Sequence, residues 1–82
     1  MAVDPADGTL KSLRAGSLVR VTGFVEDEED AMRKLLALGV APGDVLRVLS
    51  TWPAVVFEVG STSIAIDDEL ASIILVTPCA GA

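Results

Sequence analysis

The sequence lacks the side chains that most catalytic sites use. It contains no histidine and only one cysteine, Cys79, among 82 residues. Without histidine, Ser-His and Cys-His nucleophile pairs and most catalytic zinc sites are excluded. Cys79 has no basic residue near it in sequence to activate the thiol, so we expect an inert or oxidisable thiol, with a partner contact or an adventitious metal site as alternatives. We therefore predict that the chain is not an enzyme, because only convergent carboxylate pairs from residues 26–29 and 67–69 remain as catalytic groups.

Features of secreted and membrane proteins are also missing. A single cysteine cannot form an internal disulfide, and residues 1–8 have neither the basic start nor the apolar stretch of a secretory signal. No segment approaches the roughly 20 consecutive apolar residues that span a bilayer. We expect a cytoplasmic protein that does not insert into a membrane.

Basic residues are few and do not cluster. Twelve acids against six bases give a formal net charge of −6, which disfavours nucleic acid as a partner. The length predicts one domain, and a domain of this size buries only about 60% of the surface of its unfolded chain. Because 51% of the residues are hydrophobic, we expect some apolar surface to face a partner.

Short alternating segments bounded by turn residues predict β-strands. In the first, Val19, Val21 and Val25 are expected on one face, with Gly23 at a bulge or bend. The predicted strands cover residues 18–25, 44–49, 54–59, 63–67 and 73–76, and short helical turns are expected at 10–13 and 67–71. This arrangement predicts a mainly β fold, a small five-stranded β-barrel with one inserted α-helix, in which closure of the sheet removes exposed edges.

The one clear helix follows the acidic run at residues 26–30. Apolar residues then recur at spacings of three and four up to Leu38, and Gly39 is placed to form a left-handed C-cap. The acids in the first turn, with Arg33 and Lys34 further along, complement the helix dipole. Pro42 and Gly43 predict a turn. The glycines at 39–43 partly resemble a phosphate-binding loop. No Gly-Lys-Ser/Thr follows them, which favours a structural turn.

The two acidic runs allow more than one interpretation. Residues 26–30 are most simply a solvated run that favours a helix N-terminus, and residues 67–69 a similar start to a helical turn. The first run also allows a patch that meets a basic partner, or a site for a hard cation. It lacks, however, the glycine-punctuated alternation of a calcium loop.

Trp52 is the only tryptophan, and it lies in a predicted loop next to Pro53. Burial against the sheet is one interpretation. The other makes Trp52, Pro53 and Ala54 a contact patch for a partner or for a second copy of the chain, because a large aromatic side chain is costly to expose without a use.

The spacing of Leu35, Leu38, Gly39, Pro42 and Gly43 resembles the signature of the FeoA family, small cytosolic proteins of bacterial ferrous iron transport. Further landmarks occur in the family's order over residues 10–76. They are Leu10, Leu13 and Gly16 before the first strand, Pro53 before the third, Gly60 at a turn, the segment 64–66, and Ala71, Ile74 and Val76 at the end. The joint order is more specific than any single landmark.

The resemblance implies a barrel similar to Src-homology-3 (SH3) domains over residues 10–77. Residues 1–9 mix Ala, Asp, Pro and Gly without periodicity and are expected to be a flexible leader, and residues 78–82 a tail. The resemblance also implies a non-catalytic accessory protein that binds the cytosolic part of the FeoB transporter, whose soluble region carries a GTPase domain. No cofactor is implied, and no iron-binding residue carries over. The sequence departs from the family pattern at Lys34, Trp52, Asp67 and the acidic run, which leaves the docking surface open.

The alternative is a general interaction or oligomerisation module with the SH3-like fold, unrelated to transport. Similar barrels form the C-terminal domain of iron-dependent repressors, although no DNA-binding helices precede the barrel in this sequence. Self-association into a homo-oligomer is compatible with either interpretation. Direct metal binding by the acidic runs is a third hypothesis.

Overall fold

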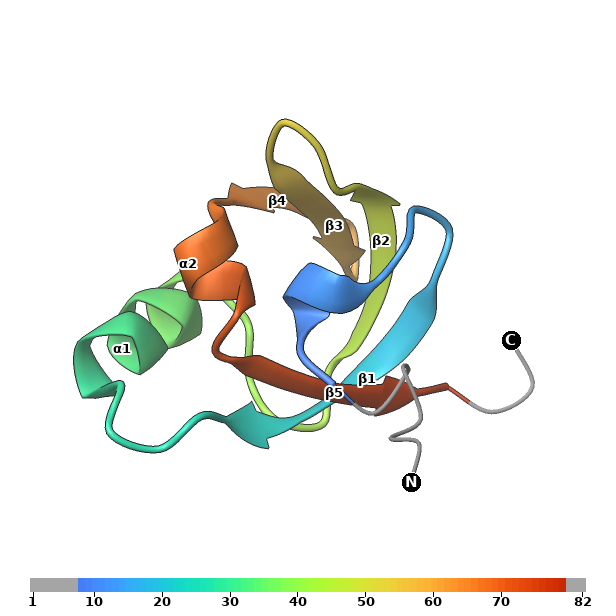
Figure 1. Ribbon diagram of the computed structural model, residues 1–82. Coiled ribbons are helices and arrows are strands. Elements are labelled where there is room, and N and C mark those ends of the chain that lie inside the picture. Colours follow the sequence, from blue (N-terminus) through green and yellow to red (C-terminus); the bar gives the residue numbers. More distant parts are fainter. Residues whose placement is uncertain (1–7, 80–82) are drawn as a thin grey trace, which may run out of the picture.

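The computed structural model describes residues 8–79, which form one curved antiparallel sheet with helical segments at its open side (Figure 1). In chain order the elements are η1 (Leu10–Ser12, a 3₁₀ helix), β1 (Leu18–Phe24), α1 (Glu29–Leu38), β2 (Val45–Ser50), β3 (Val55–Val59), β4 (Thr62–Ile66), α2 (Asp68–Ala71) and β5 (Ile74–Pro78). The strand order is β4-β3-β2-β1-β5. This confirms the mainly β class and every predicted strand, with small differences at the strand ends. No helix in the described part is long and apolar enough to cross a membrane.

The sheet does not close into a barrel, so the expected closure is wrong. Strands β4 and β5 are the two edges of the sheet, and they do not pair with each other within residues 8–79. The chain instead crosses the open side through α2, and η1 lies against β5 there (Figure 1). The edge of β5 is covered by residues before η1, because Thr9 pairs with Leu75 and the Val76 N–H donates to the Gly8 carbonyl at 2.9 Å. Side chains and the N-terminal segment therefore cover the opening that pairing of the two edge strands was expected to close.

Residues 1–7 and 80–82, which include most of the predicted leader and tail, lie outside the described residues.

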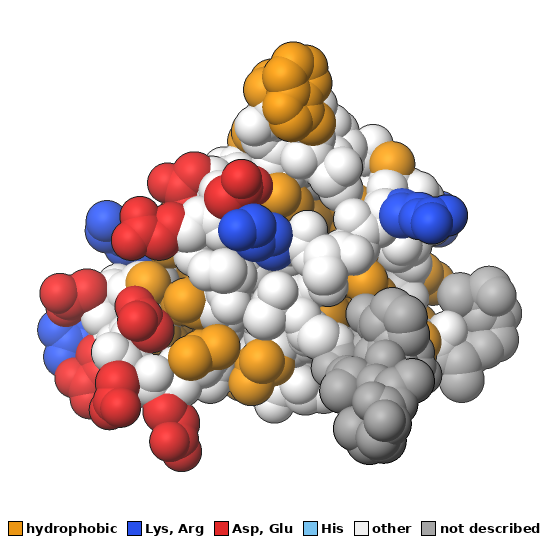
Figure 2. Space-filling model, in the orientation of Figure 1, with side chains coloured by type: hydrophobic (Ala, Val, Ile, Leu, Met, Phe, Trp, Pro, Cys, Tyr) orange, Lys and Arg blue, Asp and Glu red, His pale blue; other side chains and the backbone are white. Residues whose placement is uncertain are grey.

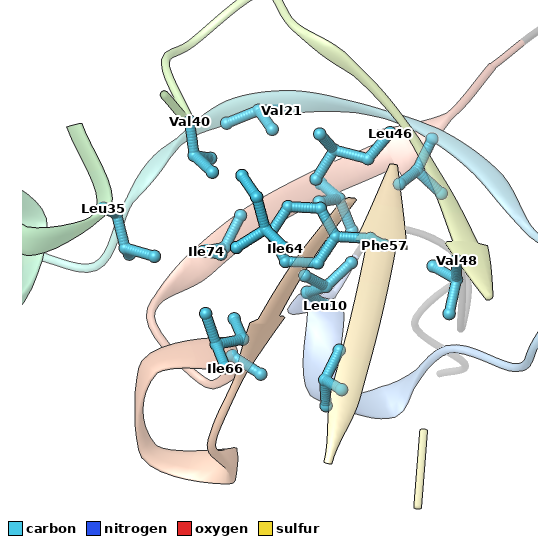
Figure 3. Close-up of a cluster of buried hydrophobic side chains, with 14 of the residues drawn as sticks. Leu10, Val21, Leu35, Val40, Leu46, Val48, Phe57, Ile64, Ile66 and Ile74 are labelled. Carbon is cyan, nitrogen blue, oxygen red and sulfur yellow. The ribbon is translucent and has the colours of Figure 1, made fainter. Parts of the chain in front are cut away.

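The core is entirely apolar. Every element contributes at least one of its buried side chains, and no polar or charged residue among 8–79 is buried. The buried set is Leu10, Val19, Val21, Leu35, Val40, Leu46, Val48, Val55, Phe57, Ile64, Ile66, Ala71, Ile73, Ile74 and Val76. Figure 3 shows the Phe57 ring among Leu10, Leu46 and Ile64, so side chains from η1 and from three neighbouring strands of the curved sheet meet at this ring.

Strand β1 contains the predicted bulge. Its register against β5 shifts between Val21 and Gly23, and two steps along β1 there match one step along β5. A bulge reverses the alternation of faces beyond it. Val19 and Val21 are buried as expected, but Val25 is 38% exposed, so its predicted position on the same face is wrong.

Helix α1 is anchored mainly through one side chain. Leu35 is its single fully buried residue, and Ala31 packs partly against the core. Glu29 and Asp30 lie in the first turn, where they complement the dipole. The last turn carries no base, so the predicted contribution of Arg33 and Lys34 at that end is wrong.

The segment after α1 is a tightly bonded structural turn. Gly39 adopts φ 107° and its N–H donates to the Leu35 and Leu36 carbonyls at 3.1 Å, which confirms the left-handed C-cap. Gly43 has φ 95°, and the Asp44 N–H donates to the Ala41 carbonyl, as in a turn with proline at the second position and glycine at the third. The Gly43 N–H donates to Val21 at 2.7 Å, and the Ala41 N–H donates to the Asp44 side chain at 2.9 Å. With these N–H groups already bonded, the segment is not a phosphate cradle.

Replacement of Leu35 with alanine tests the anchoring of α1. We expect Leu35→Ala to lower the free energy of unfolding by about 2–5 kcal/mol, because it leaves a cavity under the helix. The matched control is Leu36→Ala, since Leu36 is 45% exposed, and we expect a change within about 0.5 kcal/mol. Urea denaturation measures both values, and equal losses in the two variants would contradict this account of α1.

Replacement of Gly39 with alanine tests the C-cap. A β-carbon added at Gly39 or at Gly23 would meet no atom within 4 Å, but only Gly39 has a positive φ. We expect Gly39→Ala to cost about 1–2 kcal/mol of unfolding free energy through backbone strain alone. Gly23→Ala is the control and should change it by no more than about 0.5 kcal/mol. Similar thermal unfolding curves for both variants would refute the role of the left-handed conformation.

Candidate functional site

The loop between β2 and β3 carries the most exposed large hydrophobic side chain of the described chain. Trp52 is 82% exposed, which rules out the interpretation that it is buried against the sheet. The loop projects at the top of Figure 1, and the space-filling view shows a hydrophobic projection at the same place (Figure 2). Ser50 fixes the start of the loop, because its hydroxyl donates to the Trp52 carbonyl at 3.0 Å.

A shallow hollow of about 530 Å³ adjoins this loop. Pro53 and Ala54 form one side of it, and Ala65 and Ile66 form the other. These two segments are close because β3 and β4 form a hairpin in which Val55 pairs with Ile66 and Val56 with Ala65. The predicted patch of Trp52, Pro53 and Ala54 thus extends onto the end of β4, and we call the combined surface the Trp52 surface.

Carboxylates border the hollow where α2 begins. Asp67 has a structural role, since its side chain accepts a hydrogen bond from the Leu70 N–H at 2.8 Å and caps the helix. Asp68 and Glu69 are exposed at the rim. This confirms that the run at 67–69 starts a short helix, and it gives the Trp52 surface an acidic border.

The other candidate residues lie elsewhere. The acidic run at 26–30 spans the turn between β1 and α1 and the first two residues of α1, at the lower left of Figure 1, away from the β2–β3 loop. Cys79 is a half-buried free thiol after β5, and its backbone N–H donates to the Leu18 carbonyl at 3.0 Å. Of the motif residues, Leu35 is buried, whereas Leu38 is 47% exposed on α1.

Within residues 8–79, no three carboxylate or thiol groups come together as they would around a metal ion. The Trp52 surface instead combines an exposed aromatic side chain, a shallow apolar floor and a charged rim. Interface hot spots typically pair a large aromatic anchor with surroundings that exclude water. The arrangement is therefore suited to binding another macromolecule.

Sequence reasoning missed Ala65 and Ile66 as members of this surface. A signal was present, because a two-residue turn at Gly60 and Ser61 sets the hairpin register and places Ala54 near the end of β4. What the register does not show is whether the loop folds inward or outward, which decides the exposure of Trp52.

The comparison with protein families identifies one match. The model of the FeoA domain family matches residues 8–78. Among curated protein sequences, none matches this chain significantly.

Solved structures share the fold. A crystal structure of an iron uptake regulatory protein (FeoA) is 25% identical, with a TM-score of 0.79 over 88% of this chain and 96% of that one. The solution structure of a FeoA protein from Chlorobium tepidum is 26% identical, with a TM-score of 0.75 over 90% of this chain and 72% of that one. IdeR of T. acidophilum is 30% identical with a TM-score of 0.82, and 95% of this chain matches only 37% of that protein. These similarities confirm the SH3-like fold class.

Truncation of Trp52 tests whether its role is confined to the surface. We expect Trp52→Ala to change the free energy of unfolding by no more than about 0.5 kcal/mol, because the side chain is exposed. Phe57→Ala is the control for loss of a buried aromatic and should cost about 3–5 kcal/mol. A large loss of stability in the Trp52 variant, measured by urea denaturation, would show that the indole supports the fold.

Proposed function

The chain belongs to the FeoA family, and from this premise we propose that it is a non-catalytic, cytoplasmic accessory protein of ferrous iron uptake. Its proposed partner is the cytosolic part of a FeoB-type transporter, and the Trp52 surface is the proposed contact. The observation that carries this assignment is the 82% exposure of Trp52 beside an apolar hollow.

The size of the aromatic anchor supports a binding role. An aromatic side chain buries about 150–250 Å² when it enters a pocket. At about 25 cal/mol per Å², this contributes about 4–6 kcal/mol before the costs of association. Trp52 alone therefore supplies enough free energy to act as a hot spot.

The rim specifies what the partner must present. Asp68 and Glu69 border the hollow, so a matching partner surface offers an apolar pocket for the indole with basic side chains next to it. Exposed charges at the edge of an interface mainly affect association rate and salt dependence. The indole then determines most of the affinity, and the carboxylates determine orientation.

Titration calorimetry of the purified chain with the purified cytosolic domain of the transporter, with and without guanine nucleotide, tests the proposal. We expect binding by the wild type and a loss of about 30-fold or more in Trp52→Ala, which corresponds to the roughly 2 kcal/mol that defines a hot spot. Leu36→Ala is the control, because it removes an exposed large hydrophobic side chain outside the Trp52 surface, on α1.

Absence of wild-type binding at tens of micromolar would refute the partnership. Wild-type affinity in Trp52→Ala would refute the assigned surface while leaving the partnership standing. If sedimentation shows that the chain self-associates and that Trp52→Ala abolishes this, the surface joins copies of the chain and the alternative of an oligomerisation module is favoured.

A further inference from the structure

A second apolar groove lies at the other end of the domain, between the end of β1 and the first half of α1. It has a volume of about 460 Å³, and Phe24, Val25, Met32 and Pro42 provide its apolar lining. Grooves of this size accommodate a few side chains rather than a folded domain. The space-filling view shows hydrophobic side chains next to a group of carboxylates on this side of the molecule (Figure 2). We call this feature the β1–α1 groove.

The groove results from two features of the fold. The bulge between Val21 and Gly23 turns the end of β1, and the Val25 N–H donates to the Ile73 carbonyl at 2.9 Å, which holds the strand end in its new direction. Helix α1 is held to the core at Leu35, in its second half. In its first half Ala31 and Met32 are only half-buried. The apolar lining is therefore left without a covering segment in the described chain.

One rim of the groove is formed by carboxylates. Glu26, Asp27, Glu28 and Glu29 all line it, and all four are exposed. Only Glu29 belongs to the first turn of α1, and Glu28, at the N-cap position, makes no side-chain capping bond. Within residues 8–79 none of these four forms an ion pair with lysine or arginine. Of these four carboxylates, only Glu29 is placed to stabilise the start of the helix. The other three are available to a ligand.

The combination of lining and rim selects one kind of occupant. Phosphate backbones and anionic lipid surfaces are repelled by the carboxylates. A second copy of the chain is disfavoured, because each copy carries a net charge of −6. A segment with an apolar side chain between basic residues satisfies both features at once.

We propose that the β1–α1 groove binds a short basic segment of a partner protein, with one aliphatic side chain seated between Phe24 and Met32 and flanking lysines or arginines facing residues 26–29. This binding goes beyond the role of the Trp52 surface and does not depend on it. The two surfaces lie at different ends of the domain, the β2–β3 loop at the top of Figure 1 and the turn before α1 at the lower left.

A peptide titration followed by two-dimensional NMR of the full chain tests the proposal. The probe is a synthetic peptide with a central leucine and a pair of lysines on each side, and its partner probe carries serine in place of leucine. We expect the leucine peptide to shift amide signals of residues 23–32, to bind more weakly as salt is raised, and to bind at least about tenfold more tightly than the serine peptide.

Matched variants distinguish binding in the groove from nonspecific attraction of the peptide to acidic surface. The double variant Glu26→Lys with Glu28→Lys and the single variant Met32→Gln should each weaken the leucine peptide about tenfold or more, through charge and lining respectively. Asp68→Lys with Glu69→Lys makes the same change in net charge at the other end of the domain, and Trp52→Ala removes the other surface. Both controls should bind the peptide like wild type, and the same spectra verify that each variant is folded.

Equal binding of the leucine and serine peptides, or equal weakening by the two charge reversals, would show only a diffuse attraction to acidic surface and would overturn the proposal. Loss of peptide binding in Trp52→Ala would overturn the independence of the two surfaces. Because the transporter is absent from this experiment, failure of the peptide to bind overturns the groove proposal and does not bear on the proposed function.

Discussion

The side of the sheet between β4 and β5 must be held together without backbone hydrogen bonds between those strands. Side chains from η1, from α2 and from the segment before β5 pack into this opening and complete the core, with Leu10, Ala71 and Ile73 all buried there. No polar or charged residue is buried among the described residues, so no side-chain hydrogen bond within the core specifies its arrangement. Within the core, shape and apolar packing determine how the side chains fit, while backbone hydrogen bonds at the edges join the sheet to the segments around it.

This constraint affects the surface. A core confined to one thin layer cannot accommodate every apolar side chain of a chain that is 51% hydrophobic. The excess lies partly at two places where backbone geometry turns side chains outward, the β2–β3 loop with Trp52 and the end of β1 with Val25. The acidic charge around both places keeps such apolar surface compatible with a dissolved chain.

Much of the fold was predictable because glycines and prolines mark the turns and alternation marks the strands. The C-cap at Gly39 and the bulge at Gly23 follow from residue chemistry that acts locally. The errors concern relations that local pattern does not contain. Val25 was assigned to the wrong face because the bulge changes the phase of the alternation, and sheet closure was expected because strand number does not show whether the edges meet.

The residues of the candidate site were partly predictable from the sequence, but their arrangement in space was not. Trp52 was recognisable as a rare aromatic residue in a loop, whereas its exposure depends on how that loop leaves the sheet. The β1–α1 groove is formed by residues that are separate in sequence, and its two walls meet only because Leu35 positions the helix.

The two surfaces differ in how firmly their parts are held. The Trp52 loop joins two strands that are paired with each other, and the hollow beside it is built on the paired ends of β3 and β4. A surface on such a frame is largely preformed, so little conformational entropy is lost when a partner binds. The wall of the β1–α1 groove is a helix with one fully buried side chain, and in its first half only Ala31 packs partly against the core. Rigidity therefore favours the Trp52 surface for a shape-specific partner, and the less constrained groove favours a short segment to which the helix can adjust.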